Sequence, residues 1–154
     1  MKEEEKINLT YNSVNLKFVS VLASKIAVNL EKGDSLSLTG ELGVGKTVIS
    51  RFIINTFLPN EDVCSPTFSL INEYQCSKFI IYHADFYRLK SINEVYEIGF
   101  LDMVTDNVGI IEWPELVQNI INFSLCINLQ YSKKNNTRNI IIKCNKSWYN
   151  KLIT

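Results

Sequence analysis

The sequence predicts an α/β domain with a mixed parallel and antiparallel sheet. Helix-like and strand-like segments alternate in the first part of the chain, and two later pairs of strand-like segments are joined by turns too short for a helical crossover. The chain of 154 residues fits one domain, residues 1–154, and 46% of its residues are hydrophobic, enough for a buried core.

The first part of the chain has a helix, then a strand, a glycine-rich turn and a second helix. Apolar residues at helical spacing predict a helix over 14–30. The alternating segment 35–39, Ser-Leu-Ser-Leu-Thr, predicts a short strand. Helical spacing resumes over 48–57, after the glycines, and stops before Pro59.

Two predicted hairpins and a buried strand make up the rest of the sheet. Short polar turns join the strands of each hairpin, and a continuous apolar run suits a central strand. The predicted hairpins are 67–74 with 79–84 and 125–131 with 139–144, the central strand is 108–112, and a helix interrupted at Gly99 spans 91–104.

Charge and composition exclude several classes of protein. Lys+Arg and Asp+Glu are 16 each, so the whole chain has no net field that requires a polyanionic partner. The acidic N-terminus, residues 1–6, lacks the order of a signal peptide, and no apolar run approaches the roughly 18 residues of a membrane span. We therefore expect a cytoplasmic protein with no membrane association.

The charges are nevertheless unevenly placed. All acidic residues lie within 1–115, whereas residues 116–154 carry six basic residues and no acid. One interpretation is a basic face for a phosphate, RNA or an acidic partner. The other, which the composition favours, is a set of solvated strand edges. The basic residues are Lys133, Lys134, Arg138, Lys143, Lys146 and Lys151.

The four cysteines predict neither a zinc site nor a disulfide framework. They stand at 64, 76, 126 and 144, with no C-x-x-C pair and no clustered histidine. We expect buried, reduced thiols.

Residues 40–47, Gly-Glu-Leu-Gly-Val-Gly-Lys-Thr, satisfy the phosphate-loop pattern G-x-x-x-x-G-K-[ST] between a predicted strand and a predicted helix. Glycines let successive backbone N–H groups turn inward and form an anion site at the positive end of the following helix. Lys46 reaches the β- and γ-phosphates, and the Thr47 hydroxyl is suited to ligate Mg²⁺. The loop predicts binding of a nucleoside triphosphate.

The remaining residues favour an ATPase over other nucleotide-binding enzymes. A GTPase would need an N-K-x-D motif, and the matching stretch 145–148 lacks the aspartate. A small-molecule kinase normally uses several lid arginines, and this chain has only three arginines. Asp85 and Glu112 each end a predicted strand, where a carboxylate can bind the metal or polarise the attacking water. A regulatory module that binds nucleotide without turnover remains an alternative.

Five motifs in order give a closer resemblance. Together they resemble the bacterial TsaE family, also called YjeE, over residues 13–144. The motifs are the loop at 40–47, Ser-Pro-Thr-Phe-Ser-Leu at 65–70, Tyr-His-Ala-Asp-Phe-Tyr-Arg-Leu at 82–89, Glu-Ile-Gly-Phe at 97–100 and Ile-Glu-Trp-Pro-Glu at 111–115.

The resemblance implies a P-loop NTPase-like three-layer fold with an unusual mixed sheet. It also implies Mg²⁺-dependent ATP hydrolysis that supports or resets a two-subunit TsaB–TsaD complex. That complex transfers threonylcarbamoyl to N6 of adenosine 37 in tRNAs that read ANN codons. Contact with tRNA would be indirect or through the basic C-terminal third, and the chain itself would not be the transferase.

Site residues follow from the matched motifs. The resemblance assigns catalytic roles to Lys46, Asp85 and Glu112, and Mg²⁺ ligation to Thr47 and Glu112. Trp113 is expected near the nucleotide, where its ring would stack on adenine. Arg138 is expected to contact nucleotide or tRNA, or to be a solvated charge of the last hairpin. Residues expected to bind ATP or ADP are Leu42, Gly43, Val44, Gly45, Lys46, Thr47, Val48, Trp113 and Arg138.

Three further positions complete the expectations. Ser65 and Thr67 resemble a switch that senses the γ-phosphate, with a capped turn before Pro66 as the alternative. His83, the only histidine, is expected to have a structural role rather than to transfer protons. The stretch 13–17 lacks the acidic pair and threonine that the family often places near adenine, and Val48 replaces a second hydroxyl.

Overall fold

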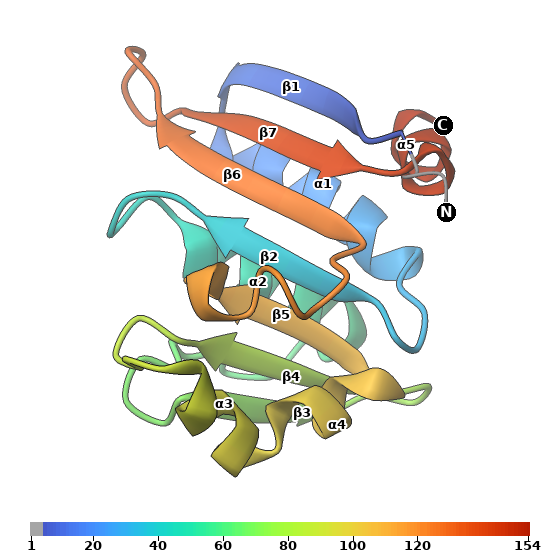
Figure 1. Ribbon diagram of the computed structural model, residues 1–154. Coiled ribbons are helices and arrows are strands. Elements are labelled where there is room, and N and C mark those ends of the chain that lie inside the picture. The colour runs from blue at the N-terminus through green and yellow to red at the C-terminus, as the bar shows by residue number, and fades with distance from the viewer. Residues whose placement is uncertain (1–4) are drawn as a thin grey trace.

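The computed structural model describes residues 5–154 as one seven-stranded sheet with helices on both faces (Figure 1). Residues 1–4, part of the acidic N-terminal stretch, lie outside the described residues. The elements are β1 (Ile7–Val14), α1 (Leu16–Val28), β2 (Ser35–Thr39), α2 (Lys46–Phe57), β3 (Ile71–Gln75), β4 (Ile80–Asp85), α3 (Ile92–Ile98), α4 (Phe100–Thr105), β5 (Val108–Glu112), the 3₁₀ turn η1 (Pro114–Leu116), β6 (Leu125–Tyr131), β7 (Arg138–Cys144) and α5 (Lys146–Ile153).

The sheet is mixed, as the sequence predicts. The strand order is β1-β7-β6-β2-β5-β4-β3. Strands β6, β2, β5 and β4 are parallel to their neighbours in this central block, whereas β1, β7 and β3 pair antiparallel at the two edges. Because the central strands are parallel, the carboxyl ends of β2, β5 and β4 meet at one edge, where ligands bind in open α/β sheets.

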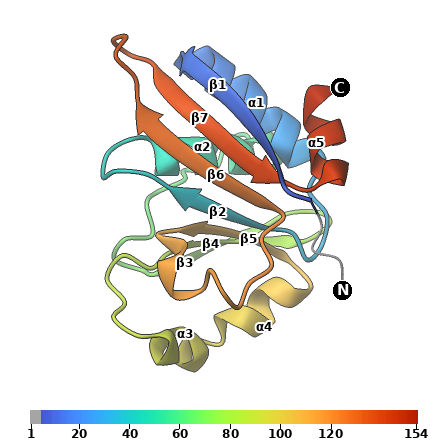
Figure 2. The same cartoon turned by 45° about the horizontal axis from the view of Figure 1, so that its top comes forward.

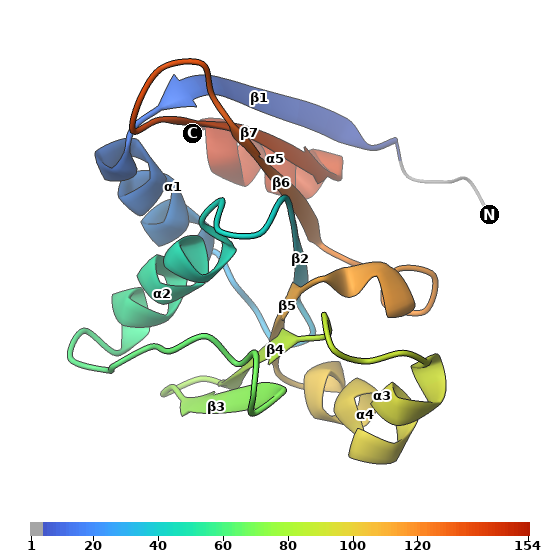
Figure 3. The same cartoon turned by 90° about the vertical axis from the view of Figure 1, so that its left-hand side faces the viewer.

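Helices on both faces give the three-layer arrangement. Figure 3 shows α1 and α2 on one face, while α3, α4 and η1 cover the lower part of the other. Each layer has its own apolar core. The first core joins α1, α2 and α5 to residues such as Leu36, Ile110 and Ile127, and the second joins α3 and α4 to Ala84, Phe86 and Ile111. The predicted α/β three-layer fold is confirmed.

The sequence-based boundaries need correction at the N-terminal helix. The predicted helix 14–30 is shorter, Leu16–Val28, and the Asn15 side chain caps it by accepting a hydrogen bond from the Phe18 N–H. Val21 is apolar and falls at a helical spacing, but it is 62% exposed, whereas Val19 and Ala23 are buried. A prediction made from the large apolar side chains alone overlooks the small Ala23 on the buried side of the helix.

Two elements are absent from the sequence-based prediction. Strand β1 pairs with β7, and its inward side chains, Ile7, Leu9 and Tyr11, alternate with polar residues in the pattern of an edge strand. Helix α5 packs Trp148 and Leu152 into the first core. Both elements are polar on one side, so their apolar periodicity covers only two or three residues.

The strand predicted over 67–74 begins later, at Ile71. Leu70 has a φ of 67°, and its N–H donates to the Pro66 carbonyl at 2.8 Å, so residues 66–70 form a closed turn. The predicted interruption at Gly99 is confirmed: its φ of 77° separates α3 from α4.

All four thiols are free, but only two are buried as predicted. Cys76 and Cys144 lie in the core, where burial raises the pKa of both thiols. Cys64 is exposed and Cys126 half-buried, contrary to the prediction. Within residues 5–154, no helix is both long and apolar enough to cross a bilayer.

Candidate nucleotide-binding site

The glycine-rich loop joins the carboxyl end of β2 to the first residue of α2. Gly40, Gly43 and Gly45 all have positive φ, and Gly45 caps the helix. At Gly40 a side chain is excluded, because a Cβ there would lie 2.4 Å from the Leu129 carbonyl oxygen. The loop is therefore held against β6 in a conformation that turns backbone N–H groups toward an anion.

Lys46 is buried at the start of α2, with 5% of its surface exposed. Its Nζ donates to the carbonyl oxygens of Gly40 (2.7 Å) and Glu41 (3.0 Å), and it lies 4.3 Å from the centre of the Trp113 ring. Burial lowers the pKa of Lys46, while the nearby carboxylates of Glu112, Asp85 and Glu115 act in the opposite direction. The ammonium thus sits beside the loop with its hydrogen bonds directed to backbone atoms.

Glu112 connects the loop to the interior of the sheet. The Thr47 hydroxyl donates to its two carboxylate oxygens at 3.0 and 3.4 Å. On the inner side, Nε2 of the fully buried His83 lies 2.8 Å from Oε1 of Glu112. His83 Nδ1 has no hydrogen-bond partner. The histidine therefore contacts a candidate metal ligand, and its structural role stays a prediction.

Asp85, at the end of β4, forms a second polar group in the same cavity. Its Oδ2 accepts from the Thr67 hydroxyl at 3.0 Å, and its Oδ1 accepts from the Tyr87 N–H at 2.9 Å. The Ser65 and Thr67 hydroxyls lie 2.7 Å apart. Because the turn 66–70 folds back toward β4, Thr67 contacts the predicted catalytic carboxylate directly, and Ser65 contacts Thr67.

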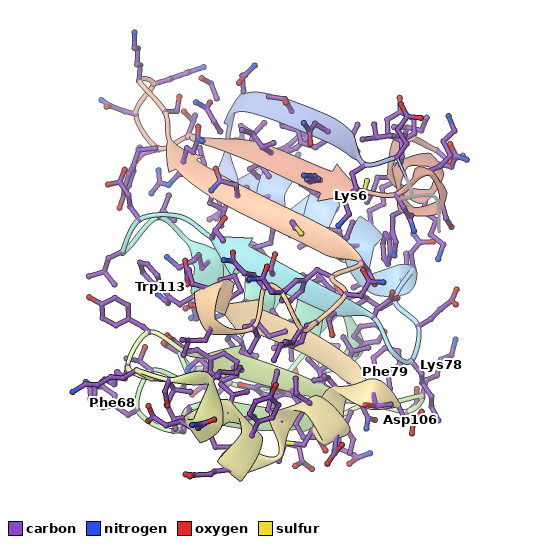
Figure 4. The ribbon with its side chains drawn as sticks, in the orientation of Figure 1. Lys6, Phe68, Lys78, Phe79, Asp106 and Trp113 are labelled. Carbon is purple, nitrogen blue, oxygen red and sulfur yellow. The ribbon has the colours of Figure 1, made fainter. Side chains whose placement is uncertain are left out.

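Trp113 follows Glu112 with a φ of 54°, in the left-handed region that a tryptophan rarely occupies. This conformation turns its ring toward Lys46 and to 4.7 Å from the ring of Tyr87. Figure 4 shows Trp113 and Phe68 at the same end of the sheet, away from Lys78 and Asp106. Strained residues of this kind concentrate at functional sites.

These side chains surround one cavity of about 220 Å³. It brings together Lys46, Thr47, Asp85 and Glu112, which come from the start of α2 and from the ends of the two parallel strands β4 and β5. Its lining residues are Leu42, Gly43, Gly45, Lys46, Thr47, Val48, Ser65, Thr67, Asp85, Glu112 and Trp113.

The donor set of this cavity fits a magnesium–triphosphate ligand. Mg²⁺ prefers oxygen ligands and usually binds through one or two carboxylates together with substrate phosphates. The described residues contain no cluster of three or more His, Cys, Asp or Glu side chains suited to a metal. A metal at this site would therefore rely on Thr47, Glu112 and the phosphates, as phosphate-loop proteins do.

A second cavity, of about 380 Å³, lies on the other side of the loop. Most of its lining is apolar, and the loop glycines and Val48 belong to both cavities. Trp113 is not part of it. Its lining residues are Val14, Asn15, Leu16, Val19, Gly43, Val44, Gly45, Val48, Leu129, Asn136 and Arg138.

Arg138 attaches the last hairpin to the loop. Its Nε donates to the Val44 carbonyl at 2.8 Å, and its guanidinium lies 4.8 Å from the ring centre of Tyr131, whose hydroxyl donates to the Leu42 carbonyl at 3.1 Å. Arg138 is therefore held against the loop by a hydrogen bond, and its contact with nucleotide or tRNA stays a prediction.

Sequence reasoning did not identify several residues that line or support the second cavity. Leu16, Val19 and Leu129 are apolar and carry no motif. Tyr131 was recognised only as a strand residue. Asn136 has a φ of 57°, and such a conformation at asparagine is the one local signal available in the hairpin turn.

Comparison with known proteins gives a consistent family. The family model described as "Threonylcarbamoyl adenosine biosynthesis protein TsaE" matches residues 14–140. Proteins named "tRNA threonylcarbamoyladenosine biosynthesis protein TsaE" include one from Rickettsia felis, 41% identical over 74% of this chain and 68% of its own, and one from Rickettsia prowazekii, 41% identical over 73% and 80%. A protein of the same name from Bacillus subtilis is 32% identical over 71% of this chain and 69% of its own.

A solved structure supports the fold. The crystal structure of YdiB from Bacillus subtilis has a TM-score of 0.73 and covers 98% of this chain and 95% of its own, at 24% identity. At that identity the likeness concerns the fold alone.

Proposed function

Because the chain belongs to the TsaE family, whose role is in the biosynthesis of threonylcarbamoyladenosine in tRNA, we propose that it acts there as a Mg²⁺-dependent ATP hydrolase. One observation carries the proposal: Lys46, Thr47, Asp85 and Glu112 converge on a single cavity beside a phosphate loop. The chain would support threonylcarbamoyl transfer without performing it.

The triphosphate would lie across the loop, with its negative charge facing Lys46 and the loop N–H groups. The Lys46 ammonium now donates to two carbonyl oxygens of the loop, and phosphate oxygens are stronger acceptors. Burial lowers the pKa of Lys46 because it disfavours the charged ammonium. A bound phosphate would stabilise that charged form.

Thr47 and Glu112 would hold Mg²⁺, which supplies charge neutralisation and orientation of the phosphates when it is bound. The hydrogen bond from the Thr47 hydroxyl to the Glu112 carboxylate holds these two oxygen ligands next to each other before a metal binds. His83 holds the Glu112 carboxylate from behind, so its orientation is fixed before a ligand arrives.

Asp85 would orient the attacking water and accept its proton during hydrolysis. In the structure its Oδ2 accepts from Thr67, which contacts Ser65. A γ-phosphate that takes the Thr67 hydroxyl as a donor would free this oxygen for water. The switch residues would thereby link phosphate binding to the availability of the base.

The base of ATP would occupy the apolar cavity on the far side of the loop, beside Leu16 and Val19. Stacking of adenine on Trp113, which the resemblance implies, is the alternative placement of the base, because the Trp113 ring lines the phosphate cavity beside Lys46. The partner would be a TsaB–TsaD-like complex that the ATP cycle resets between turnovers.

The test is hydrolysis of ATP by the purified chain with Mg²⁺, alone and with the partner complex and tRNA. We expect a rate that rises with the partners, and Lys46→Ala should abolish both hydrolysis and support of tRNA modification while the circular dichroism spectrum is unchanged. A Lys46→Ala protein that supports threonylcarbamoylation at the wild-type rate would overturn the proposal. Nucleotide binding without hydrolysis under every condition would instead favour a regulatory binding module.

A further inference from the structure

One face of the sheet is left uncovered over β1, β7 and β6. The helices α1, α2 and α5 pack on the opposite face, and α3, α4 and η1 cover the region of β2, β5, β4 and β3, with Cys126 of β6 at its margin (Figure 3). Figure 2 shows the β6–β7 hairpin extending past the rest of the sheet at its turn. The uncovered face, which we call the open face, thus runs from the N-terminal end of β1 toward this turn.

The side chains of the open face form polar rows across the strands. Asn8 pairs in register with Lys143, and Lys143 with Cys126. The next row brings Thr10, Ile141 and Asn128 together. Since alternate residues of a strand point to opposite faces, and the intervening Leu9, Ile140 and Ile142 pack in or against the core, these rows belong to the open face.

Hydrogen bonds connect part of this surface into a fixed array. The Gln130 amide donates to Asn128 at 2.8 Å, and the Asn128 amide donates to the Thr39 hydroxyl at 2.9 Å. The Ser13 N–H donates to Asn139 at 2.8 Å at the end of the same rows. Amides and hydroxyls held in this way are common partners of phosphate and sugar oxygens.

The charge of the open face is positive. Lys6 and Lys143 are exposed on it, and Lys133 with Lys134 lies at the exposed turn of the hairpin. Residues 116–154 contain no acidic residue to neutralise them. Among residues 5–154, the carboxylates adjoining the face are at its borders: Glu5 beside the N-terminal end of β1 and Glu115 in η1.

A groove of about 570 Å³ lies between the open face and the segment that follows β5. Of the described residues that line it, Lys6 alone is charged and none is a carboxylate. Figure 4 shows Lys6 in front of β7 near the end of the strand. Its lining residues are Lys6, Ser37, Thr39, Pro114, Gln118, Asn119, Ile120, Ile121, Asn122, Phe123 and Cys126.

We propose that the open face binds the sugar–phosphate backbone of tRNA, a partner class that rests on the proposed role in tRNA modification. Lysines, amides and hydroxyls, with carboxylates only at the border of the face, match the contacts that position a protein on a nucleic-acid backbone. The rows across β1, β7 and β6 carry no aromatic side chain, so stacking on bases is not the mode of recognition. Base identity would be read elsewhere in the pathway.

The test compares two charge-reversal pairs of equal net charge. Lys6→Glu/Lys143→Glu alters the open face, and the matched control, Lys32→Glu/Lys78→Glu, alters exposed lysines in the turns before β2 and between β3 and β4, neither of which lines the groove. Binding of a fluorescein-labelled tRNA transcript that reads ANN codons is followed by anisotropy between about 50 and 200 mM salt. We expect the first pair to weaken binding about tenfold or more and to lower the salt slope by about 2, while the control changes both little.

Alkylation of the thiols supplies a second measurement that needs no substitution. Cys126 lies half-buried in the groove, and Cys64 is exposed outside it. Bound tRNA should slow alkylation of Cys126 by iodoacetamide and leave that of Cys64 unchanged. Equal rates at Cys126 with and without saturating tRNA would overturn the proposal.

Two other outcomes would also overturn it. Equal weakening by both pairs would mean attraction to overall charge, and retention of tRNA binding by the Lys6/Lys143 pair together with loss of the TsaB–TsaD-like complex would make the face a protein interface. ATP hydrolysis in the absence of RNA should be unchanged in both pairs, because none of these lysines lines either cavity beside the loop. Failure of the proposed hydrolase would appear in the wild-type chain instead, so the two failures are distinguishable.

Discussion

The two cavities beside the phosphate loop are built from different parts of the chain. The cavity of about 220 Å³ takes its polar groups from the loop and from the ends of the adjacent strands β5 and β4, whereas the cavity of about 380 Å³ takes mostly apolar groups from the start of α1, from β6 and from the last hairpin. Hydrogen bonds therefore position the polar side chains of the first cavity, whereas van der Waals packing positions the apolar side chains of the second.

This difference predicts how each cavity responds to change. In the first, Lys46, Asp85 and Glu112 are each at most 5% exposed, and a buried charge depends on its few specific partners. In the second, one methyl group more or less alters contact area but leaves no charge unpaired. Substitutions should cause large losses of hydrolysis on one side of the loop and modest losses of affinity on the other.

The largest effect is expected for Glu112→Gln. The amide keeps the shape of the side chain but lacks the negative charge that would hold Mg²⁺ beside Thr47. We expect kcat for ATP to fall about 10²–10³-fold, the scale at which loss of one fixed electrostatic group acts. Binding of a fluorescent ATP analogue in the absence of Mg²⁺ should persist. The measurement is steady-state hydrolysis with the partner complex present.

Glu115→Gln is the matched control. Glu115 is exposed in η1 and lines neither cavity, although its charge acts on the pKa of Lys46. Its hydrolysis rate should stay within about twofold of the wild type, because an exposed charge is screened by solvent. Equal losses in the two variants would mean that the general negative field, rather than the Glu112 position, supports hydrolysis.

An intermediate effect is expected for Arg138→Ala, because Arg138 lines the apolar cavity and donates to Val44 in the loop that both cavities share. The change removes the hydrogen bond to the buried Val44 and the guanidinium above Tyr131. We expect the free energy of unfolding to fall by about 1–3 kcal/mol, which corresponds to about 2–10 °C in Tm for a domain of this size. The KM for ATP should rise about tenfold, since the loop loses a support on the side of the base.

Arg138→Lys separates the two contributions. It keeps the positive charge but lacks the planar group that donates to Val44 while lying over a ring. The Tm of Arg138→Lys should therefore resemble that of Arg138→Ala, whereas Lys134→Ala, in the exposed turn, should leave Tm within about 1 °C. If Arg138→Lys had wild-type Tm and KM, charge alone would account for the role of Arg138.

The same contrast explains what could be predicted from the sequence. The phosphate cavity depends on residue types that have few other uses in such an order: three glycines, Lys46 and Thr47 in one loop, and carboxylates that end two strands. Strand ends of a parallel block meet at one edge, so Asp85 and Glu112 could be predicted to converge before the sheet was seen. Hydrophobic periodicity likewise gave β5 and the last hairpin with correct or nearly correct boundaries.

The residues of the apolar cavity could not be identified in this way. Leu16, Val19 and Leu129 are far apart in sequence, and nothing in an apolar side chain distinguishes a cavity wall from a core position. The bend that ends β1 also lay outside the prediction: β1 itself was not predicted, and Ser13 has a φ of 51° just before α1 begins. Contacts made by tertiary packing leave no local pattern in the sequence. The hydrogen bond from Arg138 to Val44 therefore could not be predicted from the sequence.

The smallest effect is expected for Leu16→Ala, which removes apolar surface from the base cavity alone. Leu16 is 60% exposed, so the loss of contact with a bound base should be about 1 kcal/mol, or about fivefold in affinity for ATP. kcat should be unchanged, because the Thr47, Asp85 and Glu112 groups keep their hydrogen bonds. Isothermal titration with ATP and with inorganic tripolyphosphate would measure the two cavities separately.

Tripolyphosphate gives this comparison its control, since it carries the charge of ATP and no base. Leu16→Ala should bind it with wild-type affinity, and Val28→Ala, at the other end of the same helix and 70% exposed, should bind both ligands normally. An equal loss of affinity for ATP and for tripolyphosphate would mean that Leu16 acts by positioning the phosphate loop. A substitution in the apolar cavity would then also change phosphate binding, because both cavities share the loop. The distinction between a polar phosphate cavity and an apolar base cavity would not hold.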